Sequence, residues 1–173
     1  MYMQHINNKN YSQQGFTLIE LVIVIVLIGV LSAVALPKFA SLTTQARQAA
    51  AAGVAGGLSA AASVAHAQWL ASGSPTSITL EGQVVYMSPV VAGVGGWPED
   101  TAAVGTGTAT AAKCLAVWNG ILNSPPQAGT ACVSPCQYLV TVTASPTCKF
   151  QDQQGTGANI ITYNINTGAV VSP

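Results

Sequence analysis

Residues 21–36 form an uninterrupted apolar run, LVIVIVLIGVLSAVAL, and this run limits most strongly what the chain can fold into. Its sixteen residues carry no charge, and with residues 16–20 they reach the roughly 20 residues that a helix needs to span a bilayer. Val and Ile also suit strands, but a single span in lipid must be helical because its backbone groups have no other partners. We therefore predict a membrane-spanning helix.

The composition excludes a nucleic-acid-binding protein. Only 6% of the 173 residues are charged, and five basic side chains balance five acidic ones. An ordinary soluble domain is about 25% charged. Such a chain has no basic patch that would attract phosphates, so we expect no nucleic-acid partner. Its polar surface must come from uncharged side chains, which suits an extracellular protein that packs against copies of itself.

The order of segments differs from that of a secretory signal, in which a basic start and a short apolar core precede the cleavage site. Residues 1–15 are polar, contain a single basic side chain, Lys9, and stand before the apolar run. A small-residue site does follow at residues 33–35, Ala-Val-Ala, so cleavage by a signal peptidase is an alternative.

Glu20 lies within the apolar segment and argues against a simple anchor. A carboxylate at the bilayer centre costs about 2.5–3.5 kcal/mol, and somewhat less near the boundary. The span contains no cation, but cleavage after Gly15 would create a charged amino terminus at Phe16. Glu20 of one copy would then neutralise Phe16 of a neighbour. The alternative is that the Glu20 side chain simply extends to the membrane surface.

Residues 15–39, GFTLIELVIVIVLIGVLSAVALPKF, resemble the class III signal and N-terminal helix of type IV pilins and type II secretion pseudopilins. The resemblance implies an α+β fold, in which a long N-terminal helix packs on a small antiparallel sheet with a short additional helix. It implies that a prepilin peptidase cuts between Gly15 and Phe16 and methylates the Phe16 amine. It also implies that Glu20 pairs with a neighbour's amino terminus during assembly.

Two helix-weakening residues and the charge pattern complete this comparison. In assembled family members the helix is often unwound before a proline, and Gly29 and Pro37 would bracket that stretch here. Family leaders often carry several basic residues, whereas this one has Lys9, so a count of positive charges does not favour the expected orientation. The cysteines decide it, because they require the C-terminal side to lie outside the cytoplasm.

The chain divides into four predicted segments: a cleaved leader (1–15), an apolar membrane and filament-core helix (16–40), an amphipathic continuation (41–72) and a β-rich head (73–173). The continuation is Ala-rich, and its apolar residues at helical spacing are Val54, Leu58, Ala61 or Ala62, Ala65 and Trp69. In the head we predict strands at 77–80, 83–87, 137–143, 147–151, 159–164 and 169–171, a short helix over 111–122, and a loop over 93–107.

The four cysteines lie in the last third of the chain and suggest two disulfides, with three possible pairings. The short helix, the Trp97-Pro98 loop and the closing residues also resemble the mannose-sensitive haemagglutinin subgroup of pilins. That resemblance implies a Cys114–Cys148 bond and leaves Cys132–Cys136 as a second, small loop. Zinc binding by the cysteines is the alternative, which an exported domain disfavours.

The residues suggest no catalytic site, so we predict no enzyme, no cofactor and no metal. His66 is interpreted as a surface or interface residue. Calcium binding through Glu81, Glu99, Asp100 and Asp152 is an alternative.

We predict a pilin that polymerises with itself into a surface filament for attachment, with motility as an additional role. Before assembly it would cross the inner membrane once and meet the peptidase and the assembly machinery. A type II secretion pseudopilin is the alternative, although major pseudopilins usually lack cysteines. A membrane-tethered periplasmic binding domain or enzyme is a remote one.

Overall fold

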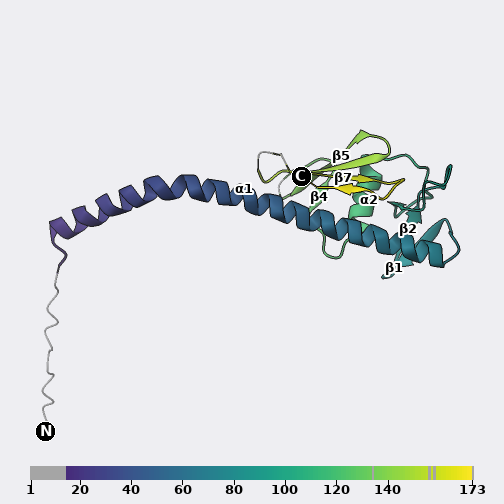
Figure 1. The fold of residues 1–173 in the computed structure, drawn as a ribbon, viewed down its shortest axis with the longest axis horizontal. Helices are drawn as coiled ribbons and strands as arrows, with labels where there is room; N and C mark the ends of the chain where they lie inside the picture. The colour runs from purple at the N-terminus through teal and green to yellow at the C-terminus, as the bar shows by residue number, and fades with distance from the viewer. Residues whose placement is uncertain (1–14, 134, 156, 158, 173) are drawn as a thin grey trace, which may run out of the picture. The chain divides into compact units, whose positions relative to one another are not determined.

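The computed structural model describes residues 15–133, 135–155, 157 and 159–172, and all but the last residue of the predicted leader lie outside this set. The chain forms two units, residues 1–42 and 43–173 (Figure 1). One α-helix, α1 (Leu18–Ala71), begins in the first unit and ends in the second. We describe each unit by itself.

The described part of the first unit consists of the apolar part of α1 and the three residues before it. Its large apolar side chains are exposed along the whole segment, from Phe16 at 91% to Leu42 at 57%. The best 18-residue window of α1 has a mean hydropathy of 3.0 and is not buried. By length and composition α1 is therefore the one helix among the described residues that is able to cross a membrane.

In the second unit α1 buries a stripe of mostly small residues. Their spacing alternates between four and three, as expected for one helix face; they are Ala51, Ala55, Leu58, Ala62, Ala65 and Trp69. Four of these are in the predicted set, while Val54 is half-buried beside the core. Small side chains at the stripe allow the rest of this unit to approach the helix closely.

The strands form two sheets that lie, with helix α2 (Ala111–Ile121), along the second half of α1 (Figure 1). The first sheet is antiparallel and contains β1 (Ser77–Leu80), β2 (Gln83–Met87) and β3 (Pro98–Asp100). The second contains β4 (Ala128–Gly129), β5 (Tyr138–Ala144), β6 (Thr147–Asp152), β7 (Ile160–Asn164) and β8 (Val170–Val171). Only the β4–β5 pair in it is parallel. The predicted α+β fold is therefore confirmed.

The main core lies where α1, α2 and the five-stranded sheet meet. Trp118 of α2 is fully buried, and its ring lies 4.4 Å from that of Phe150 and 5.1 Å from that of Tyr138, measured between centroids. A second, smaller core cluster surrounds Trp69 and includes Val85 of β2. The stripe on α1 contributes to both cores, so both sheets depend on this helix.

Two disulfides join the four cysteines. Cys114 of α2 and Cys148 of β6 are both fully buried and bonded to each other, which ties the short helix to the large sheet. Cys132 and Cys136 close a small loop before β5. These are the pairs that the family resemblance implies.

Strand β3 corrects the predicted loop over residues 93–107. The loop was predicted because this stretch is rich in Gly, Thr and Ala, and Pro, Glu and Asp are also uncommon in strands. Pro98 is the first residue of β3, where the missing N–H is tolerated. The strand forms because it pairs with β2 and because the Tyr163 hydroxyl donates to the Pro98 carbonyl at 2.9 Å. These tertiary contacts outweigh the local preference.

We predict that the two disulfides contribute unequally to stability. Cys114 and Cys148 are 34 residues apart and Cys132 and Cys136 only four. Because of loop entropy, removing the Cys114–Cys148 bond should lower the free energy of unfolding by about 4 kcal/mol. Removing the Cys132–Cys136 bond should lower it by about 2 kcal/mol. The paired variants Cys114→Ala/Cys148→Ala and Cys132→Ala/Cys136→Ala should be compared by urea unfolding in detergent, followed through tryptophan fluorescence. Equal losses would contradict this prediction.

Candidate assembly site

Thr17 and Glu20 form a closed hydrogen-bonded unit at the start of α1. Thr17 is the residue before the first helical residue, Leu18. Its backbone N–H and its hydroxyl each donate to Glu20 Oε2 at 2.9 Å, and the Glu20 N–H donates to Thr17 Oγ1 at 3.3 Å. This reciprocal arrangement is a capping box, which satisfies backbone N–H groups that a helix start otherwise leaves unpaired.

The capping box gives Glu20 a local role that the sequence analysis missed. The spacing Thr-x-x-Glu before an apolar run is the pattern that would have revealed it. A carboxylate in the first turn also interacts favourably with the positive end of the helix dipole. Both hydrogen bonds go to one oxygen, Oε2, and the described residues provide no hydrogen bond to Oε1. Glu20 therefore has acceptor capacity left.

Gly15 and Phe16, the predicted cleavage pair, directly precede the capping box. Both are exposed and lie outside regular secondary structure. The Phe16 side chain is 91% exposed, and apart from the two neighbouring residues no described atom lies within 4 Å of the position that a Cβ would take at Gly15. No described residue outside this segment therefore crowds the peptide bond between them.

Gly29 and Pro37 both lie inside α1, and every residue from 29 to 37 is helical. Pro37 has no N–H, so the carbonyl four residues earlier, at Ala33, receives no helical hydrogen bond from it. No atom lies within 4 Å of a Cβ built at Gly29. Unwinding of this stretch in an assembled filament stays a prediction.

Glu99 is the most buried charged residue, with no exposed surface. It forms an ion pair with Lys113 of α2 and accepts hydrogen bonds from the backbone N–H groups of Thr106 and Gly107 at 2.7 and 2.8 Å. Burial alone would raise the pKa of Glu99, but the contacts with these three residues outweigh it and hold the pKa below the ordinary value of 4.5. The carboxylate therefore fixes the segment after β3.

Because Glu99 is engaged in this way, it is not available as an open calcium ligand. Among the residues that the structure describes, no group of three or more His, Cys, Asp and Glu side chains could hold a metal ion. Asp100 accepts from the backbone N–H groups of the two residues after it. Asp152 accepts from the Gln154 N–H and the Asn159 amide.

His66, interpreted from the sequence as a surface or interface residue, makes contacts within its own chain that the sequence did not indicate. It is half-buried, and its ring stacks on that of Trp97 at 4.1 Å between centroids with an angle of 5°. Its Nδ1–H donates to the Gly96 carbonyl. Gly96 in turn lies against the Trp69 ring, where a Cβ would come within 2.4 Å of a ring carbon. The histidine thus positions the segment before β3, and its isolated place in the sequence carried no signal of this.

Comparison with known proteins finds similarity mainly for the N-terminal segment. The family model described as "Prokaryotic N-terminal methylation motif" matches residues 10–36. The chain is 51% identical over 63 residues to the type IV narrow pilus major component PilA5 of Thermus thermophilus, covering 36% of this chain and 53% of that protein. It is 37% identical over 104 residues to the type IV major pilin protein PilE of Neisseria gonorrhoeae, covering 60% and 47%.

A fimbrial protein of Neisseria meningitidis serogroup B is 38% identical over 92 residues, which cover 49% of this chain and 54% of that protein. The chain spans about half the length of these curated relatives. No solved structure matches it. Similarity to type IV pilins is therefore established for the motif-bearing N-terminal part, and the resemblance to the mannose-sensitive haemagglutinin subgroup stays a prediction.

Replacing Thr17 by Val should open the first turn of α1. The substitution removes the hydroxyl that both donates to Glu20 and accepts from it, and loss of a cap costs about 1 kcal/mol, or about fivefold in the opening equilibrium. Hydrogen exchange of the Glu20 amide, which donates to the Thr17 hydroxyl, should accelerate by this factor when it is measured in micelles. Thr17→Ser keeps the hydroxyl and is the control, so acceleration in both variants would contradict the prediction.

Replacing Glu99 by Gln should destabilise the second unit in a pH-dependent manner. Because the folded pKa of Glu99 is lowered, its stabilisation is present above the unfolded pKa and is lost as the pH falls through the folded value. We expect the free energy of unfolding to fall by about 3–5 kcal/mol at pH 7, since Lys113 is left without its partner. In urea unfolding at pH 2, the free energies of unfolding of the variant and the wild type should differ by less. An equal difference at both pH values would contradict this account.

Proposed function

We propose that this protein is a structural subunit that polymerises into a type IV pilus-like filament on the cell surface, where it serves attachment. The observation that carries the proposal is the methylation motif over residues 10–36, which includes an apolar helical segment whose side chains are exposed among the described residues. Such a segment requires lipid or other protein around it. The pilus and fimbrial proteins to which the chain is similar support the same role.

We propose that the subunit is first processed between Gly15 and Phe16. Gly15 and Phe16 are both exposed, which a peptidase requires, and Gly15 offers no side chain that would hinder approach. Cleavage would leave the Phe16 amine as a positive charge, to be methylated, immediately before the capping box. The prepilin peptidase and the assembly machinery are the partners that this step implies.

Assembly would then depend on the Glu20 carboxylate and the Phe16 amine of a neighbouring copy. Within the apolar part of a membrane or filament, an unpaired carboxylate is unfavourable by several kcal/mol. Glu20 Oε2 is held by Thr17, while Oε1 has no partner among the described residues. The capping box therefore holds the side chain in one place and leaves one oxygen to accept from the incoming amine.

The apolar part of α1 has two successive environments in this proposal. Before assembly it crosses the inner membrane once, and the disulfide-bonded head lies on the outer, oxidising side. In the filament the same side chains, now about half to two-thirds exposed, pack against those of neighbouring copies. Gly29 and Pro37 lower the cost of unwinding between them, which lets the helix adapt to that packing. The role is mechanical, without catalysis.

The variant Glu20→Gln should separate the two roles of Glu20. Gln is also accepted in a capping box, so the first turn of the helix stays intact while the charge is lost. We expect normal cleavage and membrane insertion but a yield of sheared filaments at least roughly tenfold lower, as for a lost ion pair of more than 1.4 kcal/mol. The measurement is subunit abundance in the sheared fraction relative to the membrane fraction.

The intact mass of the sheared subunit provides the control. In the wild type it should correspond to a chain that begins at methylated Phe16 and gains four protons on reduction, as the two disulfides require. A wild-type chain that still begins at Met1, or that never reaches the sheared fraction, would refute the proposed function. A normal filament yield from Glu20→Gln would refute only the ion pair.

A further inference from the structure

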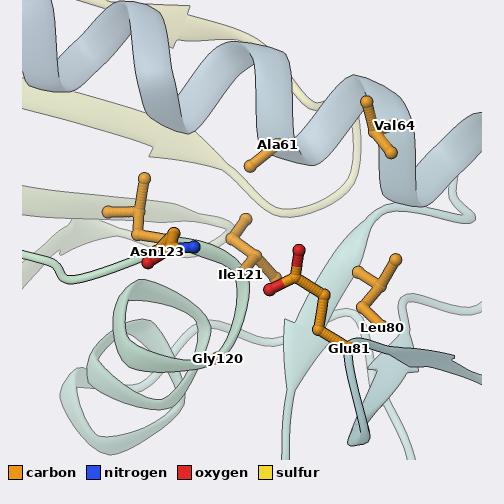
Figure 2. Close-up of a pocket in the computed structure, with 8 residues that line it drawn as sticks. Ala61, Val64, Leu80, Glu81, Gly120, Ile121 and Asn123 are labelled. Atoms are coloured by element: carbon orange, nitrogen blue, oxygen red, sulfur yellow. The ribbon is translucent and has the colours of Figure 1, made fainter.

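We infer that a hollow beside Glu81 receives the Lys149 side chain of a second copy of this chain, so that the two form an ion pair between neighbouring heads. This inference rests on the proposed function and names one contact of the proposed polymer. The hollow, about 230 Å³, lies between α1, the end of α2 and the β1–β2 turn (Figure 2). Ala61, Val64, Leu80 and Ile121 supply most of its apolar wall.

Glu81 stands out among the acidic side chains of the protein. The chain has five, and four of them accept hydrogen bonds from their own chain: Glu20, Glu99, Asp100 and Asp152. Glu81 makes no hydrogen bond or ion pair with any described residue. Glu81 is exposed, and Figure 2 shows its carboxylate at the edge of the hollow, on the side of Ile121.

The turn that carries Glu81 does not explain why a glutamate stands there. Glu81 and Gly82 have φ values of 46° and 87°, so both residues of this two-residue turn are left-handed. Asn, Asp or Gly at the first position would suit such a turn better than Glu. A long acidic side chain held in an unfavourable backbone conformation, beside a hollow, is more readily explained by a contact than by the fold.

The chemistry of the hollow fits a lysine side chain. The apolar wall would cover the four methylene groups of the stem, while the carboxylate would accept from the ammonium group at its end. Asn123, also at the hollow, offers an amide oxygen as a second acceptor. An uncharged or acidic side chain would leave Glu81 unpaired.

Among the cations of the head that the structure describes, Lys149 is half-buried and lies on the face of β6 opposite to the buried Cys148 and Phe150. Lys113 is paired with Glu99. Arg47 is also half-buried, but its guanidinium lies against Gly155 and its Nη1 is buried, so this cation is directed into its own chain. Lys38 belongs to the other unit and adjoins the apolar segment. Lys149 has no hydrogen bond or ion pair to a described residue.

Lys149 and the hollow lie on opposite sides of the large sheet. Cys148 and Phe150 flank Lys149 on β6 and are fully buried, so strand alternation directs Lys149 to the outer face. Cys148 is bonded to α2, whose end borders the hollow, so the hollow lies on the inner side. The two groups must therefore meet between copies. Contact between two different surfaces is heterologous, and it propagates along a filament when the rotation between copies does not close a ring.

Zero-length crosslinking of assembled filaments tests the inference directly. A carbodiimide joins a carboxylate to an amine only where they are in contact. Filaments from a mixture of ¹⁴N- and ¹⁵N-labelled subunits should yield a Glu81–Lys149 peptide pair with mixed labels, and Glu81→Gln should abolish it. Filaments in which Glu81 links only to another lysine, or not at all, would overturn the inference but not the proposed function. A wild type without filaments would overturn both.

Charge exchange provides a second, independent test. Glu81→Lys and Lys149→Glu should each lower the filament yield at least roughly fivefold, since each places like charges together. The double variant should recover the yield to within about twofold of wild type, because the pair is restored with reversed polarity. Gln83→Lys adds the same charge on the same hairpin, outside the hollow, and should assemble normally. A double variant no better than its parents would overturn the inference.

Discussion

The apolar half of α1 cannot remain as it is in water, and the rest of the molecule is organised around that constraint. Its side chains from Phe16 onward are exposed among the residues that the structure describes. The free energy of burying them, at about 25 cal/mol per Å², is available only in a membrane or against other copies. The head therefore has to fold without using this surface, on the second half of the same helix.

The head meets this requirement with a narrow stripe of small residues on α1 and with the buried ion pair between Glu99 and Lys113. The stripe on α1 is built largely from alanines, which contribute little area but allow close approach, so apart from Trp69 the large buried rings come from α2 and the sheet. The ion pair between Glu99 and Lys113 then connects β3, a strand of the smaller sheet, to α2. Breaking such a buried pair is costly because either partner alone is an uncompensated charge. The ion pair thus favours one arrangement of a small core. The Cys114–Cys148 disulfide adds a covalent link between α2 and the larger sheet.

The spacing of apolar residues and the positions of turn residues were sufficient to predict most helices and strands of the head. The turn residues Glu81-Gly82 marked the first hairpin, and β1 and β2 have the predicted bounds. Strand β3 and the His66–Trp97 stack could not be predicted, because they depend on contacts between segments distant in sequence. At the candidate assembly site, the motif indicated an intermolecular role for Glu20 but not its local role in the capping box with Thr17. The capping box was readable from Thr17 and Glu20 alone.

Four of the few charged side chains each make a distinct structural contact. Asp100 and Asp152 accept hydrogen bonds from loop residues, and Glu99 accepts them from the segment after β3. Glu20 caps the first helix at the place where a positive amino terminus would arise. Contacts between uncharged, Thr- and Gly-rich surfaces provide little specificity, since they lack the penalties that reject a wrong partner. A charge placed on such a surface therefore has a strong influence on how two copies align. On this argument the register between heads depends on the few ionic groups that the fold itself leaves unused, and Glu81 and Lys149 are the pair of opposite sign on the head that meets this condition.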